Sequence, residues 1–367
     1  MDFIIFNARI LTSEGTINSG SIFIKDGKIA RIGKELRKKI PGSRTIDAAG
    51  HFASPGFIDL QIYGDPKRVS AAEVRYGTTG FLTAIPCADR ETTPQMIAGA
   101  VNTIEKPPDG ARVLGINLEG PYLNKEKSGA QPKRFIREPD LNEVKRFFKI
   151  SGRHLKMMTL APELKGASRL IKSLRRNGVI ASIGHTVATY DETERAIEAG
   201  ANCATHVFNA MSCFGSREPG AIGAVLTDDR ISATVILDKA HIGIPAFKVL
   251  ARCKSAGKIA LITDSLRYDA SFKAGWDGKV YRLKDGTIAG SGLTMIKAVE
   301  NTVKFGGLSG YEAISLASKN PAGLLGLSNK GQIKEGCDAD IVLFDKDYKV
   351  SLTMVEGKVV YERRCAA

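Results

Sequence analysis

Short apolar runs separated by polar turns mark both ends of this chain. Near the N-terminus the runs cover residues 3–6, 21–24 and 28–32, and near the C-terminus they cover 339–344 and 358–361. The Asp26-Gly27 pair between two of them is a strong hairpin signal, because the turn requires positive φ at its centre. We therefore predict two β-rich end segments, 1–50 and 331–367, which pair into one small β-sandwich domain.

Between these ends, apolar runs of strand length alternate with amphipathic stretches of helix length. The candidate strands are residues 57–60, 80–84, 113–118, 156–160, 179–184, 203–205, 232–236 and 259–263. One helical stretch is 191–199, which Gly200 closes. Eight such units predict an α/β fold, a TIM (β/α)8 barrel over residues 51–330. An open doubly wound sheet is disfavoured, because no glycine-rich phosphate loop follows the first strand.

The composition, 43% hydrophobic and 25% charged, is that of a globular protein. No run approaches the roughly 20 apolar residues of a membrane span. The acidic Asp2 stands where a secretory signal would carry basic residues, and the six cysteines include no CxxC pair. We therefore expect a cytoplasmic protein without a membrane partner.

The formal net charge of +14 raises the question of nucleic-acid binding. The Lys and Arg residues are dispersed, however, and no aromatic residues are interleaved with them to stack on bases. We therefore expect no nucleic-acid partner. The charge would favour an anionic substrate, and adaptation to high temperature or solubility explains it equally well.

Polar residues follow four of the predicted barrel strands. Glu119 follows the third strand, and His185, His206 and Asp264 follow the fifth, sixth and eighth. Active sites of TIM barrels lie at these strand ends, so the four side chains are expected to converge. One carboxylate and two imidazoles suit a divalent metal with an open position for water, with Asp264 as general base. Structural roles remain open, because a histidine can be a packed core residue and either acid can cap a helix.

Three longer segments, residues 118–124, 184–190 and 205–211, resemble the N-acetylglucosamine-6-phosphate deacetylases of the amidohydrolase superfamily. The resemblance extends from residues 55–59 to residues 336–340. It implies hydrolysis of N-acetylglucosamine 6-phosphate to glucosamine 6-phosphate and acetate, with Asp264 activating the water and protonating the leaving amine. It also implies one divalent metal ion per subunit on Glu119, His185 and His206, with Zn²⁺ expected and Fe²⁺, Co²⁺ or Mn²⁺ as alternatives.

The resemblance further implies how the phosphosugar substrate is held. Arg217 and His241 would grip the sugar phosphate, with Arg217 supplied across the interface of a homodimer. Asn209 and Ala210 would line the phosphate end. The planar Arg fork matches phosphate geometry, which makes this role physically sensible. His241 also follows the seventh predicted strand, so substrate binding is its expected role and packing is the alternative.

Three features depart from the family pattern. Gln61-Ile62-Tyr63 stands where two-metal members of the superfamily carry His-x-His, so a single ion is expected. Gln131 stands where the family places a histidine that polarises the amide carbonyl, and its amide can donate only an uncharged hydrogen bond. Segment 64–76 is shorter than in the family, which predicts a trimmed first helix or substrate-covering loop. Two alternatives therefore stay open: the same reaction on another N-acetyl amino-sugar phosphate, such as N-acetylgalactosamine 6-phosphate, or a relative that binds a phosphosugar without hydrolysing it.

Overall fold

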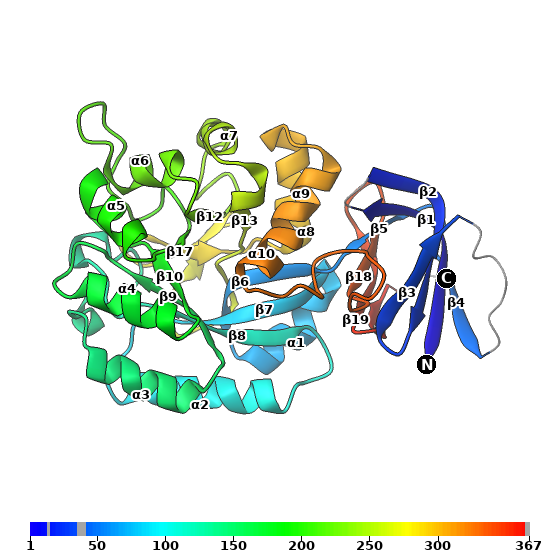
Figure 1. The fold of residues 1–367 in the computed structure, drawn as a ribbon, viewed down its shortest axis with the longest axis horizontal. Coiled ribbons are helices and arrows are strands. Elements are labelled where there is room, and N and C mark those ends of the chain that lie inside the picture. Colours follow the sequence, from blue (N-terminus) through cyan, green and yellow to red (C-terminus); the bar gives the residue numbers. More distant parts are fainter. Residues whose placement is uncertain (13–14, 35–41, 364–367) are drawn as a thin grey trace.

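The computed structural model describes residues 1–12, 15–34 and 42–363. Residues 364–367, the end of the expected C-terminal segment, lie outside the described ranges. Two β-sheets organise the chain, one surrounded by helices and the other beside it (Figure 1). Within the described ranges, no helix is both long and apolar enough to cross a membrane.

Parallel strands in sequential order form the larger sheet. They are β6 (Phe57–Gly64), β7 (Thr78–Ile85), β8 (Arg112–Glu119), β9 (Leu155–Leu160), β10 (Ile180–Ile183), β11 (Cys203–Ala204), β12 (Ser232–Val235) and β13 (Ile259–Leu261). Each strand is hydrogen-bonded to the next. Every one overlaps a predicted strand, and the predicted barrel is confirmed.

One continuous segment of the chain closes the barrel. Its first part, β13, pairs with β12, and after three intervening residues β14 (Ser265–Tyr268) pairs with β6. Between them, the Asp264 N–H donates to the Gln61 C=O at 2.9 Å. The ring therefore runs from β12 back to β6, and the carboxyl ends of the strands surround one opening.

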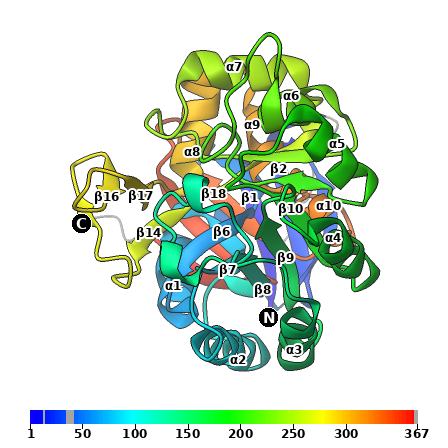
Figure 2. The same cartoon turned by 90° about the vertical axis from the view of Figure 1, so that its left-hand side faces the viewer.

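Helices cover the outside of the strands, as Figure 2 shows from the barrel end of the molecule. They are α1 (Pro66–Glu73), α2 (Thr92–Glu105), α3 (Leu141–Ser151), α4 (Ala167–Arg176), α5 (Tyr190–Glu198), α6 (Gly220–Thr227), α7 (Ile244–Cys253), α8 (Met295–Asn301), α9 (Gly310–Ala317) and α10 (Lys319–Leu324). Helix α5 matches the predicted stretch 191–199. The short segment 64–76 holds the eight-residue α1 and a single 3-10 turn, Val74–Tyr76.

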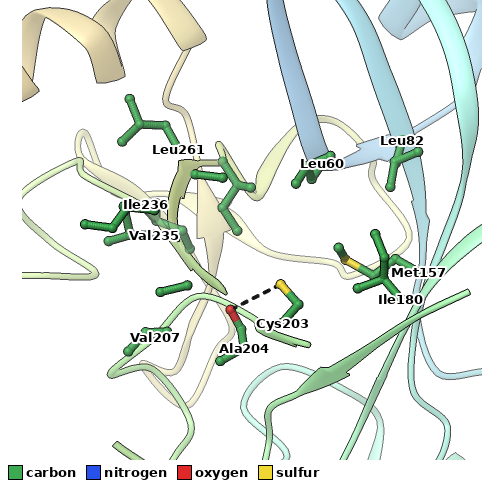
Figure 3. Packing of buried hydrophobic residues seen from close by; sticks show 14 of the residues in the cluster. Leu60, Leu82, Met157, Ile180, Cys203, Ala204, Val207, Val235, Ile236 and Leu261 are labelled. Atoms are coloured by element: carbon green, nitrogen blue, oxygen red, sulfur yellow. Dashed lines mark hydrogen bonds between the residues drawn. The ribbon is translucent and has the colours of Figure 1, made fainter. Parts of the chain in front are cut away.

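Buried aliphatic side chains fill the space around the strands (Figure 3). The two faces of strand β6 have different surroundings, because successive side chains of a strand point to opposite faces. Ile58 and Leu60 belong to the main apolar cluster. Gln61 and Tyr63 instead make polar contacts within the barrel, with Glu119 among their partners. One strand therefore supplies both a packing surface and polar groups for the opening.

The larger sheet also has an extension that was not predicted from the sequence. After β14 the chain forms β15 (Gly275–Trp276), β16 (Val280–Arg282) and β17 (Ile288–Ser291). Strand β17 returns to pair with β14 through Ser265 and Ser291. The extension therefore places β17 beside β14, just beyond the carboxyl end of the eighth barrel strand.

The smaller sheet contains strands from both ends of the chain. Its members are β1 (Asp2–Thr12), β2 (Gly15–Lys25), β3 (Lys28–Gly33), β4 (Ser43–Asp47), β5 (Phe52–Pro55), β18 (Ile341–Phe344), β19 (Val350–Val355) and β20 (Lys358–Glu362). The two ends meet where β5 pairs antiparallel with β18. All eight strands belong to one hydrogen-bonded sheet with its own apolar cluster, so the expected pairing of the two ends is confirmed.

Candidate active site

Three of the four residues predicted to bind the metal or to act as the base have an unusual backbone conformation. His185, His206 and Asp264 have φ values of 51°, 30° and 51°. Positive φ is uncommon for residues other than glycine, and it persists only where the surrounding structure enforces it. Each of these residues lies just beyond a barrel strand. The strained positions therefore gather at the same opening.

Glu119, His185 and His206 form a compact, buried group whose ligand atoms lie within 4.8 Å of one another. Glu119 Oε1 lies 3.2 Å from His185 Nε2 and 3.0 Å from His206 Nε2, and the two Nε2 atoms are 3.1 Å apart. Ligands about 2.0–2.1 Å from a tetrahedral ion would lie roughly 3.3 Å from each other. The three atoms therefore have the spacing of a metal site.

The hydrogen bonds of His185 also fit a cation. Its Nδ1 lies 2.8 Å from the Lys127 C=O, which can only accept, so Nδ1 carries a hydrogen. In the neutral ring, the Nε2 lone pair then faces the carboxylate of Glu119. When the two imidazoles are protonated, they hold the pKa of Glu119 well below its usual range, although burial acts to raise it. An anionic carboxylate with two nitrogen donors suits a divalent metal.

Asp264 lies next to this group and is buried. Its Oδ1 accepts a hydrogen bond of 2.9 Å from Gln61 Nε2, which also donates to Glu119 Oε1 at 2.8 Å. Burial and then the charge of Glu119 raise the pKa of Asp264 to about 6. A carboxyl group with a pKa near the operating pH suits a general base.

A cavity of about 280 Å³ opens beside the four residues. Of the nine predicted site residues, eight line it: Glu119, Gln131, His185, His206, Asn209, Ala210, His241 and Asp264. The remaining wall comes from Gly129, Ala130, Ile236, Ile288 and Ala289. Arg217 is the exception, because it is exposed on the loop before α6 and does not line this cavity.

Gln131 has a defined orientation at the cavity wall. Its Oε1 accepts the Cys87 N–H at 2.8 Å, so its NH₂ group faces the other way. That group donates to Glu119 Oε2 and lies 3.3 Å from the Tyr63 hydroxyl. The two donors of Gln131 are therefore engaged by Glu119 and Tyr63.

His241 is oriented by a carboxylate three residues earlier. Its Nδ1 lies 2.7 Å from Asp238 Oδ2, and its backbone N–H donates to Asp238 Oδ1 at 2.8 Å. Because Nδ1 is engaged, Nε2 is the ring nitrogen available to a ligand in the cavity. Asp238 was not among the predicted site residues, although its spacing from His241 is a local signal.

Sequence reasoning also missed the roles of Gln61 and Tyr63, since both were considered only as poor metal ligands. Both contact Glu119, through Gln61 Nε2 and the Tyr63 hydroxyl. Their alternation with Asp59 along the first strand was a signal that all three share one face of β6.

Comparison with known proteins places these features in a family. The model of the Amidohydrolase family matches residues 52–360. The chain is 33% identical to N-acetylglucosamine-6-phosphate deacetylase of Lysinibacillus sphaericus, covering 98% of both chains. It is 31% identical to N-acetylgalactosamine-6-phosphate deacetylase of Escherichia coli O157:H7, covering 96% of this chain and 97% of that protein.

A solved structure extends the similarity to three dimensions. It is a mutant of the N-acetyl-D-glucosamine-6-phosphate deacetylase of Mycobacterium smegmatis in complex with N-acetyl-D-glucosamine-6-phosphate. The TM-score is 0.89 at 28% identity, covering 98% of this chain and 99% of that chain. The match therefore includes both sheets.

Proposed function

The chain belongs to the amidohydrolase family, and from this premise we propose that it hydrolyses N-acetylglucosamine 6-phosphate to glucosamine 6-phosphate and acetate. The observation that carries the proposal is the convergence of Glu119, His185 and His206 with Asp264 on one cavity. Deacetylases acting on N-acetyl amino-sugar 6-phosphates match this chain over nearly its whole length. These matches support an enzyme that cleaves a carbon–nitrogen amide bond.

In the proposed reaction, Asp264 accepts a proton and later donates it. When bound to Glu119, His185 and His206, a divalent cation supplies Lewis-acid polarisation of the acetyl carbonyl and activation of water. Asp264 takes a proton from the attacking water as the oxygen–carbon bond forms. It then gives that proton to the amine nitrogen as the carbon–nitrogen bond breaks, releasing acetate. We assign Zn²⁺ to the site, with Fe²⁺, Co²⁺ and Mn²⁺ as alternatives.

We assign the remaining cavity residues to the substrate. On substrate binding, the Gln131 amide exchanges its 3.3 Å contact with the Tyr63 hydroxyl for an uncharged hydrogen bond to the acetyl oxygen. His241, Asn209 and Ala210 line the space for the sugar phosphate. Arg217 is exposed outside the cavity of its own subunit. We therefore propose a homodimer in which Arg217 of the partner subunit binds the phosphate, since an Arg fork suits that group.

A cytoplasmic location is part of the proposal. Cys87, Cys203 and Cys337 are free thiols that the fold buries. Unpaired cysteines of this kind are typical of a reducing compartment.

The same reaction on N-acetylgalactosamine 6-phosphate is the second candidate, because one relative at 31% identity carries that name. A test would load the purified protein with Zn²⁺, measure its metal content, and follow acetate release from both phosphosugars and from unphosphorylated N-acetylglucosamine. We expect the highest kcat/KM with N-acetylglucosamine 6-phosphate. Preference for the galactosamine compound would favour the second candidate, and no acetate from folded, metal-loaded protein would reject the enzymatic proposal.

A further inference from the structure

Gln61 lies at the centre of the site, although it is neither one of the three proposed metal ligands nor part of the cavity wall. It is buried, and its side chain contacts four polar groups. Its Nε2 donates to Glu119 Oε1 at 2.8 Å and to Asp264 Oδ1 at 2.9 Å. We propose that Gln61 is a positioning residue that holds the Asp264 carboxylate beside the metal ligand Glu119. This inference rests on the proposed function in one respect, the role of Asp264 as base.

The orientation of the Gln61 amide is fixed from both ends. Its Oε1 accepts from Thr205 Oγ1 at 2.9 Å and from Asn117 Nδ2 at 3.4 Å. At the other end, two carboxylates can only accept hydrogen bonds when they are ionised. Rotating the amide by 180° would place its oxygen against both of them. A neutral side chain with two N–H groups is therefore matched to a position between two like charges.

The main chain of Asp264 is held separately from its carboxylate. Its N–H donates to the Gln61 C=O at 2.9 Å, and its C=O accepts from the Ser291 N–H at 2.9 Å. The Gln61 N–H in turn donates to Asp59 Oδ1 at 3.1 Å, and the same oxygen accepts the Thr263 N–H at 3.2 Å. These main-chain bonds do not require the Gln61 side chain. Replacing that side chain should therefore free the carboxylate of Asp264 to rotate while its backbone stays in place.

Gln61→Leu removes both donors at similar side-chain volume and is the direct test. With Zn²⁺-loaded protein and N-acetylglucosamine 6-phosphate, we expect kcat to fall about 10- to 100-fold, the range for losing a hydrogen bond to a charged group. We expect KM to change less than about threefold, because Gln61 lies outside the cavity wall. A loss of kcat without a change in KM separates positioning from substrate binding.

Thr205 offers a matched pair that leaves Gln61 itself intact. Thr205→Val removes the hydroxyl that holds the Gln61 oxygen but keeps the shape of the side chain, whereas Thr205→Ser keeps the hydroxyl. We expect kcat of Thr205→Val to fall about 3- to 10-fold and that of Thr205→Ser to stay within about twofold of wild type. This pair also serves if Gln61→Leu does not fold.

Crystal structures of the Zn²⁺-loaded wild type and variants give a readout that does not depend on activity. We expect the Asp264 carboxylate in Gln61→Leu to be displaced by about 1 Å or more relative to Glu119, with the metal retained. An unmoved carboxylate, kcat within twofold of wild type, or metal loss as the sole change would overturn the inference. If wild-type protein releases no acetate from either phosphosugar, the proposed function fails, and the position of Asp264 alone decides the role of Gln61.

Discussion

The proton-transfer role assigned to Asp264 leads to the first prediction. In Asp264→Asn the amide cannot accept the proton of the attacking water, although it fills the same space. We expect kcat to fall about 10²- to 10⁴-fold, the usual contribution of a general base, with metal content unchanged. Acetate release and elemental analysis check the two parts. Asp285→Asn, at an exposed turn, is the matched control and should keep wild-type activity. A kcat within tenfold of wild type for Asp264→Asn would contradict the assignment.

A second residue-scale prediction concerns pH and Glu73, a buried acid away from the cavity. Burial raises the pKa of Glu73 from 4.5 to about 7, although Arg267 and a hydrogen bond from the Tyr268 hydroxyl act to lower it. The folded protein therefore holds this proton more tightly than the unfolded chain does. The associated stability is fully present below pH 4.5 and is lost as pH rises through 7, roughly 3 kcal/mol in all.

Glu73→Gln removes this titration while keeping an oxygen that can accept from Tyr268. We expect the free energy of unfolding of the variant to fall less between pH 5 and pH 8 than that of wild type. Urea denaturation at the two pH values measures the difference. The exposed Glu91→Gln should follow wild type. Parallel pH dependence in wild type and Glu73→Gln would show that the Glu73 proton does not contribute.

At the scale of single elements, helix α5 begins with a capping box. Thr189 Oγ1 accepts the Glu192 N–H at 3.2 Å, and Glu192 Oε2 accepts the Thr189 N–H at 2.9 Å. We predict that Thr189→Ala lowers the free energy of unfolding by about 1 kcal/mol, because a cap for an otherwise unpaired N–H is lost. Thr189→Ser should retain most of that stability in the same urea measurement. Acetate release should be unchanged in both, and a large loss of kcat in Thr189→Ala would contradict a purely local role.

The barrel strands could be predicted because their signals are local. Each is an apolar run next to an amphipathic helix, and a strand such as β8 remains recognisable without knowledge of its neighbours. The extension from β14 to β17 gave no such signal. Strand β15 has two residues, both exposed, β16 has three residues and β17 has four, and runs of this length are too short for a clear periodicity. Ile288 and Ala289, which reach the cavity wall, were missed for this reason.

The candidate site likewise contains residues that could be predicted from the sequence and contacts that could not. Glu119, His185, His206 and Asp264 could be placed because a barrel brings strand ends together, whatever the details of its closure. The contacts of Gln61 could not be inferred, because its partners come from β8 and from the segments after β11 and β13. Their convergence on one amide depends on the register around the closed ring.

At the scale of the whole molecule, charged groups join the two sheets. Lys330 Nζ lies 2.9 Å from Asp340 and 3.2 Å from Glu356, both near strands of the smaller sheet. Glu356 also pairs with Arg112 of β8 at 2.9 Å. We propose the domain division 1–50 plus 331–367 and 51–330, with these ion pairs at the junction. Of these pairs, Lys330–Asp340 is buried, whereas Arg112 and Glu356 are partly exposed. We propose that the buried pair helps to fix the orientation of the two domains relative to each other.

The last prediction concerns the proposed homodimer. If Arg217 serves the cavity of its partner, Arg217→Ala and Asp264→Asn are each inactive alone, for different reasons. A hybrid dimer then contains one intact site, in which Asp264 of the first chain meets Arg217 of the second. Unfolding and refolding an equal mixture should recover about a quarter of wild-type activity, since half of the dimers are hybrids with one working site each. Arg217→Lys should bind the phosphosugar more weakly than wild type although it keeps the positive charge, because Lys lacks the planar fork. A mixture no more active than its parents, or a monomer by light scattering, would show that Arg217 does not act across an interface.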